Sequence, residues 1–123
     1  MLLLAVGSLV PLAGGLAAVA AEASPMTAYV ANAGGSVTPI EVATNKPGSE
    51  IKVGTEPVAV AVPPDGKTAY VTNYGSESVT PIEVATNKPG SEIKVGSFPK
   101  AIAITPDGKT AYVVNEQGDS VTP

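Results

Sequence analysis

The sequence contains neither cysteine nor histidine, and it also lacks arginine and tryptophan. Without cysteine there are no disulfides and no thiolate nucleophiles. Without either residue type, most zinc sites and the Ser-His-Asp arrangement are excluded as well. The seven basic residues are all lysines, and the formal net charge is −4. Binding to nucleic acid usually requires a basic face, so we expect no nucleic-acid partner.

Aromatic residues are scarce, whereas glycine and proline are abundant. The chain has one Phe and four Tyr against 13 Gly and 12 Pro. The core must therefore consist mainly of Val, Ile, Ala and Pro, and this composition favours strands and tight turns over helices. A chain of 123 residues forms one small domain with a modest core.

The N-terminal residues 1–21 carry no charge, and two A-x-A sites follow at residues 18–20 and 21–23. This pattern predicts that residues 1–23 are a secretory signal peptide or an N-terminal apolar segment, and that the protein is extracellular or at the cell surface. The basic residues that usually precede such a segment are missing. An uncleaved membrane anchor and an ordinary buried segment are the alternatives.

Everything after Pro25 is repetitive. Residues 36–54 read SVTPIEVATNKPGSEIKVG, residues 78–96 are identical, and the block begins again at residues 120–123. A second block, PDGKTAYV, occurs at residues 64–71 and 106–113. The period of 42 residues is typical of four-stranded propeller blades or of helical-pair solenoids.

The pattern within each repeat favours strands. Residues 57–62 and 99–104 alternate large and small apolar side chains, and a Pro-Asp-Gly-Lys turn follows each run, with Gly66 or Gly108 free to take positive φ. No segment shows an apolar stripe with helical spacing. We therefore expect an all-β fold, a partial β-propeller of four-stranded antiparallel meander blades. The expected strands span residues 27–33, 36–43, 50–54, 57–62, 67–73, 78–85, 91–95, 99–104 and 109–115.

The segment Tyr70-Val71-Thr72-Asn73, with its variants at residues 29–32 and 112–115, resembles the repeats of the YVTN β-propeller family. The resemblance extends over residues 26–123. It implies a surface or secreted propeller, often of about seven blades. Many relatives have no known catalytic activity, while some similar propellers are lactonases or carry redox cofactors.

The blade count predicts an incomplete ring. We expect the repeats at residues 24–123 to comprise a partial blade at 27–54, a complete blade at 57–96 and a partial blade at 99–123. Because propellers close with at least four blades, these boundaries suggest a fragment of a larger propeller. Its open blade edges predict self-association.

Two glycine-containing segments resemble catalytic or phosphate-binding motifs only superficially. Residues 66–68 and 108–110 read Gly-Lys-Thr, but Ala61 and Ala103 stand where a P-loop requires glycine. Hairpin turns explain both segments better.

The S-x-x-K pattern at residues 49–52 and 91–94 would require a helix to bring its Ser and Lys together, and strands are expected there. Asp65 and Asp107 are lone carboxylates beside glycine, so turn capping is favoured over cation binding. We therefore predict no catalytic, metal-binding or cofactor-binding residues.

The aromatic residues divide into two groups. Tyr29, Tyr70 and Tyr112 occupy equivalent positions, which indicates core packing rather than a ligand-stacking site. Tyr74 and Phe98 break the repetition and lie in connections between strands, where binding residues concentrate. Tyr74 and Phe98 are the predicted contacts with a partner.

The sequence thus predicts an exported, non-catalytic module that binds an unidentified protein or surface ligand, or that acts as a structural scaffold. The alternative is part of a propeller enzyme, either a lactonase-like hydrolase or a quinoprotein-like oxidoreductase, with its active residues in other blades.

Overall fold

The structure is a computed structural model that describes residues 3–6, 9–10, 22–23 and 26–123, with side chains from Met26 onward. Throughout these residues the regular elements are β-strands, and all the strand pairs are antiparallel. The expected all-β fold is therefore confirmed. No helix that is long and apolar enough to cross a membrane occurs in the residues just named.

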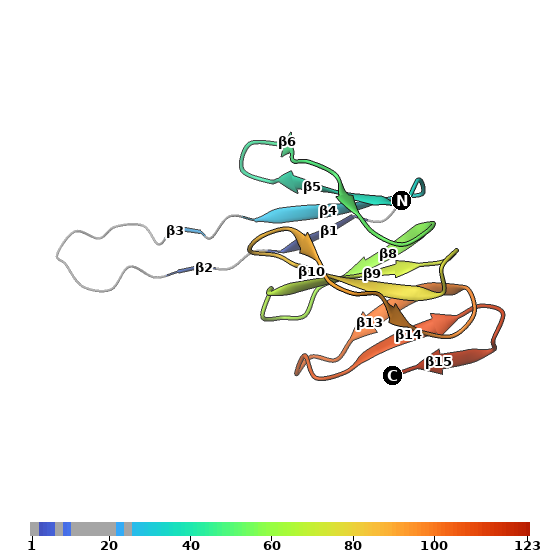
Figure 1. Cartoon of the computed structure of the whole chain (residues 1–123). Coiled ribbons are helices and arrows are strands. Elements are labelled where there is room, and N and C mark those ends of the chain that lie inside the picture. Colours follow the sequence, from blue (N-terminus) through green and yellow to red (C-terminus); the bar gives the residue numbers. More distant parts are fainter. Residues whose placement is uncertain (1–2, 7–8, 11–21, 24–25) are drawn as a thin grey trace.

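The second sheet shows the organisation of a blade most completely. Strands β8 (Pro57–Ala61), β9 (Thr68–Asn73) and β10 (Ser78–Glu83) form a meander. Two short strands, β11 (Lys88–Pro89) and β12 (Ile93–Lys94), then pair with different halves of β10. Figure 1 shows this sheet between the other two.

The first sheet repeats this arrangement with β4 (Thr27–Asn32), β5 (Ser36–Glu41), β6 (Lys46–Pro47) and β7 (Ile51–Lys52). It also contains β1 (Leu3–Val6), which pairs with β4 on the edge where β8 pairs with β9.

The repeat pattern did not predict β1, because residues 3–6 do not resemble the inner strand of the other repeats. Backbone pairing requires no particular side-chain pattern, so an apolar run can occupy this edge. The remaining two strands before Met26, β2 (Leu9–Val10) and β3 (Glu22–Ala23), pair only with each other.

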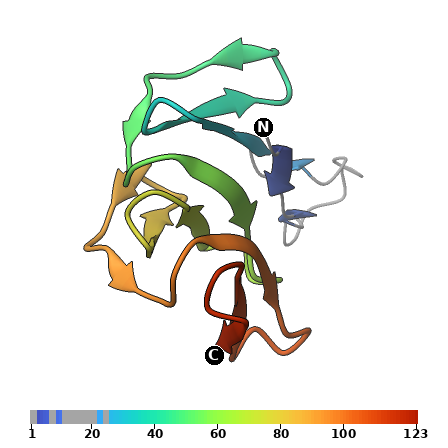
Figure 2. The ribbon, with the colours of Figure 1, turned by 90° about the vertical axis from the view of Figure 1, so that its right-hand side faces the viewer.

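The third sheet consists of β13 (Pro99–Ile104), β14 (Ala111–Asn115) and β15 (Ser120–Thr122). The view in Figure 2 shows the three sheets following one another as successive blades, and β8 of the middle sheet contacts both β4 and β13. This arrangement confirms a partial propeller.

The Pro-Asp-Gly-Lys turns form as the sequence predicts. Gly66 has a φ of 68° and Gly108 a φ of 71°, in the left-handed region that glycine adopts readily. In each turn the aspartate Oδ1 accepts a hydrogen bond of 3.0 Å from the lysine backbone N–H two residues later. Asp65 and Asp107 therefore cap turns.

Residues 87–90 read Asn-Lys-Pro-Gly, which predicts a turn at these positions, but the structure places the turn earlier, at residues 84–87. The backbone N–H of Asn87 donates to the Glu83 carbonyl at 2.8 Å, and Asn87 itself has a φ of 55°. The chain thus reverses before Lys88, and Lys88–Pro89 already pairs with Ile82–Glu83. Asparagine tolerates the left-handed conformation. The turn can therefore end at Asn87, before the Pro89-Gly90 pair.

The main core lies between the first and second sheets. Alternate residues of each strand point toward the neighbouring sheet, so small and branched side chains interdigitate there. Its buried members are Tyr29, Ala31, Val37, Ile51, Val60, Ala69, Val71 and Ile82. Full burial of one such branched side chain contributes about 1.5–3 kcal/mol, so this interface stabilises the pair of sheets.

The three repeated tyrosines differ in burial. Tyr29 is fully buried, Tyr70 is half-buried, and Tyr112 is 46% exposed. Tyr29 and Tyr70 face the sheet that follows their own, and Tyr112 points to the corresponding side of the third sheet. Core packing is therefore confirmed for Tyr29, but it is wrong for Tyr112, because no other sheet among the described residues covers that face of β14.

Candidate functional site

The two aromatic residues that depart from the repeat lie against each other. Tyr74 follows β9 and Phe98 immediately precedes β13, so they come from connections of different sheets. Their ring centroids are 4.9 Å apart, and the ring planes are tilted by 52°. A tilted geometry at this distance is favourable for an aromatic pair. Both side chains remain half-exposed, which leaves the pair available for contact with another molecule.

Backbone hydrogen bonds hold the two connections in place. The N–H of Tyr74 donates to the Glu56 carbonyl at 2.8 Å, and the N–H of Glu116 donates to the Phe98 carbonyl at 2.9 Å. Phe98 has a φ of 55°, which is unusual for a bulky residue, and Glu56 has a φ of 51°. The repeat therefore fixes this backbone conformation, whatever side chain the position carries.

An ion pair borders the aromatic residues. Lys100 Nζ lies 2.8 Å from Glu116 Oε1, and both side chains are largely exposed. The hydrogen bond from Lys100 lowers the pKa of Glu116, and the same bond raises the pKa of Lys100. Desolvation and the nearby charge of Glu116 raise the pKa of Tyr74. We name this group of Tyr74, Phe98, Lys100 and Glu116 the aromatic rim.

The aromatic rim has no counterpart between the first two sheets. The repeat positions of Phe98 and Lys100 are held there by Glu56 and Val58, and Ala33 follows β4 where Tyr74 follows β9. The sequence predicted Tyr74 and Phe98 as contacts, and the structure brings them together. The sequence analysis did not predict the ion pair. A signal was present, because Lys100 and Glu116 stand where the preceding repeat has Val58 and Tyr74.

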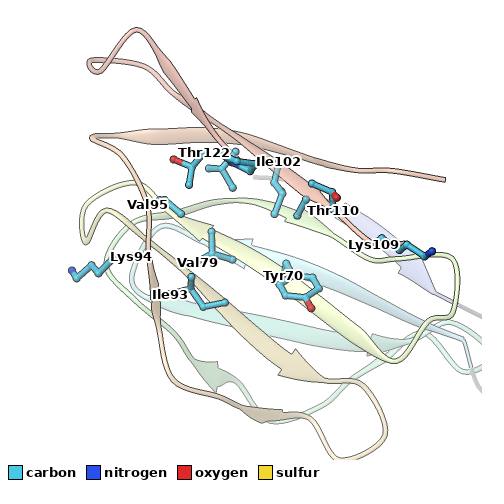
Figure 3. A pocket seen from close by; sticks show the side chains of 12 residues that line it. Tyr70, Val79, Ile93, Lys94, Val95, Ile102, Lys109, Thr110 and Thr122 are labelled. Carbon is cyan, nitrogen blue, oxygen red and sulfur yellow. The ribbon is translucent and has the colours of Figure 1, made fainter. Parts of the chain in front are cut away.

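A second feature is a cavity of about 270 Å³ between the second and third sheets. Figure 3 shows Tyr70 and Val79 of the second sheet pointing toward Ile102 of the third. Most of its walls are apolar, and two lysines lie at its border. The residues that line it are Tyr70, Val79, Ile93, Lys94, Val95, Ile102, Lys109, Thr110, Ala111, Val113, Thr122 and Pro123.

The asparagine at the end of each central strand has a structural position. Asn73 is fully buried, and its Nδ2 donates to Ser78 Oγ at 3.1 Å and to Thr80 Oγ1 at 2.8 Å. Asn115 makes the same two bonds to Ser120 and Thr122. Each amide thus fastens the central strand to the next one, and this explains why the repeat carries asparagine here.

Residues 26–123 bring together no group of three or more carboxylates that could hold a metal ion. The Gly-Lys-Thr segments form hairpin turns, as expected from the absence of the P-loop glycine.

Comparison with known proteins identifies relatives of this arrangement. A family model described as "Lactonase, 7-bladed beta-propeller" matches residues 18–123. A chain of Kuenenia stuttgartiensis hydrazine synthase superposes with a TM-score of 0.70 at 43% sequence identity, over 72% of this chain.

A functionally unknown protein from Desulfotomaculum acetoxidans superposes with a TM-score of 0.62 at 19% identity over 79% of this chain, which shows likeness of fold. The chain spans 26% of the hydrazine synthase chain and 43% of the Desulfotomaculum chain. No curated protein matches the sequence.

Proposed function

The chain belongs to the family of seven-bladed β-propeller lactonases, and within this fold we propose that its blades serve as an exported, non-catalytic binding module. The aromatic rim is the contact surface of this module. The observation that carries the proposal is the meeting of Tyr74 and Phe98, at 4.9 Å, in connections where the repeat elsewhere has no aromatic residue. Aromatic residues with a polar border are typical of protein contact surfaces.

We also assign the repeats to the YVTN type. The segment Tyr70–Asn73 supplies a tyrosine facing the next blade and an asparagine that fastens two strands of its own blade. Both roles are structural. They support the proposal that the repeated strands form a scaffold, while the connections between strands carry different side chains.

The second candidate is a lactone hydrolase, which the family description favours. Lactone hydrolysis requires a base or a metal ion that activates water. Among the residues of this chain, which include no histidine, a carboxylate is one group that could serve as the base. The Thr105 hydroxyl and the Lys109 N–H hold the pKa of Asp107 below its usual 3.8, and Lys100 lowers that of Glu116. These shifts weaken both groups as bases, which supports the non-catalytic proposal.

An activity assay separates the two candidates. We expect no acid release above buffer when the full chain is incubated with γ-butyrolactone or δ-valerolactone in a pH-stat. Turnover that is lost on Asp107→Asn or Glu116→Gln would contradict the proposal and favour the hydrolase.

A crosslinking experiment tests the contact surface. A photoreactive benzoylphenylalanine replaces Phe98, and the matched control carries it at the exposed Glu50 of the first sheet. In cells that produce the protein, position 98 is expected to give a discrete adduct that is reduced by Tyr74→Ala. Equal labelling from both positions, or labelling that Tyr74→Ala leaves unchanged, would show that the aromatic rim is not a binding surface.

A further inference from the structure

Four connections between strands meet at the end of the second and third sheets where the aromatic rim lies. They are residues 53–56, 74–77, 95–98 and 116–119. Backbone hydrogen bonds join each connection to the next. Tyr74 donates to Glu56 at 2.8 Å, Val95 to Glu77 at 3.1 Å, and Glu116 to Phe98 at 2.9 Å. The four connections therefore form one continuous surface.

This surface carries more negative than positive charge. The four connections contain no lysine, and their carboxylates are Glu56, Glu77, Glu116 and Asp119. Two lysines reach the surface from neighbouring strands, and both have partners. Lys100 pairs with Glu116 at 2.8 Å, and Lys94 donates to the Ser76 carbonyl at 3.0 Å. Because the carboxylates outnumber the lysines, a positively charged partner is complementary to this surface.

Glu56 brings one of these carboxylates close to the aromatic pair. Its side chain lies against Gly75, where an added Cβ would be 3.0 Å from Glu56 Oε2. Desolvation raises the pKa of the neighbouring Tyr74, and the charges of Glu116 and Glu56 raise it further. Within residues 26–123, Glu56 forms no ion pair, whereas Glu116 is paired with Lys100. Glu56 is therefore the carboxylate beside the rings that can pair with an incoming cation.

A guanidinium group fits this combination of groups better than an ammonium does. It is planar, it stacks on aromatic rings, and it forms two parallel hydrogen bonds with a carboxylate. The half-exposed rings of Tyr74 and Phe98 offer the stacking surface, and Glu56 offers the carboxylate. Arginine is also enriched at protein contact surfaces.

We propose that the aromatic rim binds an arginine side chain of a partner protein, whose guanidinium stacks on Tyr74 and Phe98 and pairs with Glu56. This inference rests on the proposed function, because it names the chemistry of the partner at the same surface. Between the first and second sheets the equivalent positions hold Ala33 and Glu56 in place of the two rings. The described residues therefore contain one such site.

Nuclear magnetic resonance tests the site with a defined probe. The full chain, labelled with ¹⁵N, is titrated with N-acetyl-L-arginine amide. Saturable shifts are expected for the backbone amide signals of Tyr74, Gly75 and Phe98, with one site per chain. N-acetyl-L-citrulline amide keeps a planar side-chain group of similar size but lacks the charge. It should bind about tenfold more weakly, because the charge-assisted hydrogen bonds are lost.

Variants of the chain separate the two parts of the site. Glu56→Gln removes the negative charge and should weaken binding of the arginine probe about tenfold. Tyr74→Leu removes one ring and should weaken it about threefold to fivefold. The matched control is Glu50→Gln, which removes an exposed carboxylate of the first sheet and should leave the affinity unchanged. Circular dichroism checks that each variant is folded.

Absence of saturable arginine binding would overturn this inference. Equal affinity for the arginine and citrulline probes would also overturn it, and so would an affinity that Glu56→Gln leaves unchanged. Crosslinking from position 98 distinguishes this failure from failure of the proposed function, because it requires no particular partner chemistry. A discrete adduct that is reduced by Tyr74→Ala but not by Glu56→Gln would overturn the arginine site and leave the contact surface in place.

Discussion

The hydroxyl of Tyr29 donates a hydrogen bond of 2.8 Å to Oδ1 of Asn87, which joins the first sheet to the turn after β10 in the second. The two residues are 58 positions apart in the chain. The tyrosine ring is fully buried, whereas the asparagine is exposed. A buried tyrosine therefore reaches a polar partner at the edge of the interface. The ring supplies apolar packing between the two sheets, and the hydroxyl supplies a hydrogen bond between them.

Replacing Tyr29 with Phe removes this hydrogen bond and keeps the ring. We expect the free energy of unfolding to fall by about 0.5–1.5 kcal/mol, the usual net contribution of one such bond. Urea denaturation followed by circular dichroism measures the change. The matched control is Tyr112→Phe, whose half-exposed hydroxyl should contribute close to nothing; a loss as large for Tyr112 as for Tyr29 would contradict the assigned role.

Stability should also depend on alkaline pH through Tyr29. Burial raises the pKa of this tyrosine above its ordinary value of 10.0, because the charged phenolate is poorly solvated inside the interface. The stabilisation is therefore complete below pH 10 and is lost as the pH rises through the higher pKa of the folded state. Midpoints of urea denaturation between pH 8 and pH 11 should fall more steeply for the native chain than for the Tyr29→Phe variant, and identical profiles would exclude this explanation.

Gly96 should not tolerate a side chain. A Cβ at this position would lie 2.5 Å from Asn115 Nδ2 and 2.6 Å from its Cγ, so the asparagine would have to move and give up its two hydrogen bonds. We expect Gly96→Ala to destabilise the fold by about 1–3 kcal/mol. Gly34→Ala is the control, since a Cβ there meets nothing within 4 Å. Similar melting temperatures for the two variants would count against the close approach at Gly96.

The buried asparagines should matter more than their half-buried counterpart. Asn73→Ala leaves the buried Ser78 and Thr80 hydroxyls without their amide donor and creates a small cavity. The expected loss is about 2–3 kcal/mol. Asn32 makes the same pair of bonds, to Ser36 and Thr38, in a half-buried site. Asn32→Ala should therefore cost clearly less, and the reverse order would refute the dependence on burial.

Removal of the N-terminal segment should expose the inner edge of β4. We predict export with cleavage before Ala21 or before Ser24, which intact-mass measurement of the secreted protein tests directly. Either cleavage removes β1, which pairs with β4 from Thr27 to Val30.

The chain of residues 24–123 should therefore unfold at lower urea concentration than the full chain and should associate more strongly in light scattering. Equal stability and a monomer unaffected by concentration would show that β1 does not support the first sheet.

The repeat pattern predicted the long strands of the three repeats because the alternation and the turns agree, but it did not predict β1 or the short strands β6 and β11. Gly66 and Gly108 mark reversals that only a few residue types can make, so their turns were predictable at the level of single residues. The turn that ends at Asn87 was predicted too late in the sequence. Asn87 and the Pro89-Gly90 pair both favour turns, and local preferences alone do not show which of them the chain uses. Burial of Tyr112 was predicted wrongly because it depends on a neighbouring sheet, not on the residue itself.

The candidate site was predictable only in part. Departure from the repeat singled out Tyr74 and Phe98, but their contact depends on how successive sheets are rotated, which no short segment encodes. The cavity was not predicted at all. Its lining residues come from two different sheets, and no short segment of sequence shows that they face one another.

The shared backbone conformation of Glu56 and Phe98 has a consequence for how such proteins diversify. One position holds a carboxylate and the other a phenyl ring, yet their φ values are 51° and 55°. The left-handed conformation is unfavourable for both residues, and the carbonyl of each accepts an equivalent backbone hydrogen bond from the connection after the central strand, which holds it in place. A different side chain can therefore be introduced at this position in one blade, by point mutation or by recombination between copies, while the strand register stays the same. In these two blades, the connection before the inner strand thus varies in side chain while its backbone conformation stays the same.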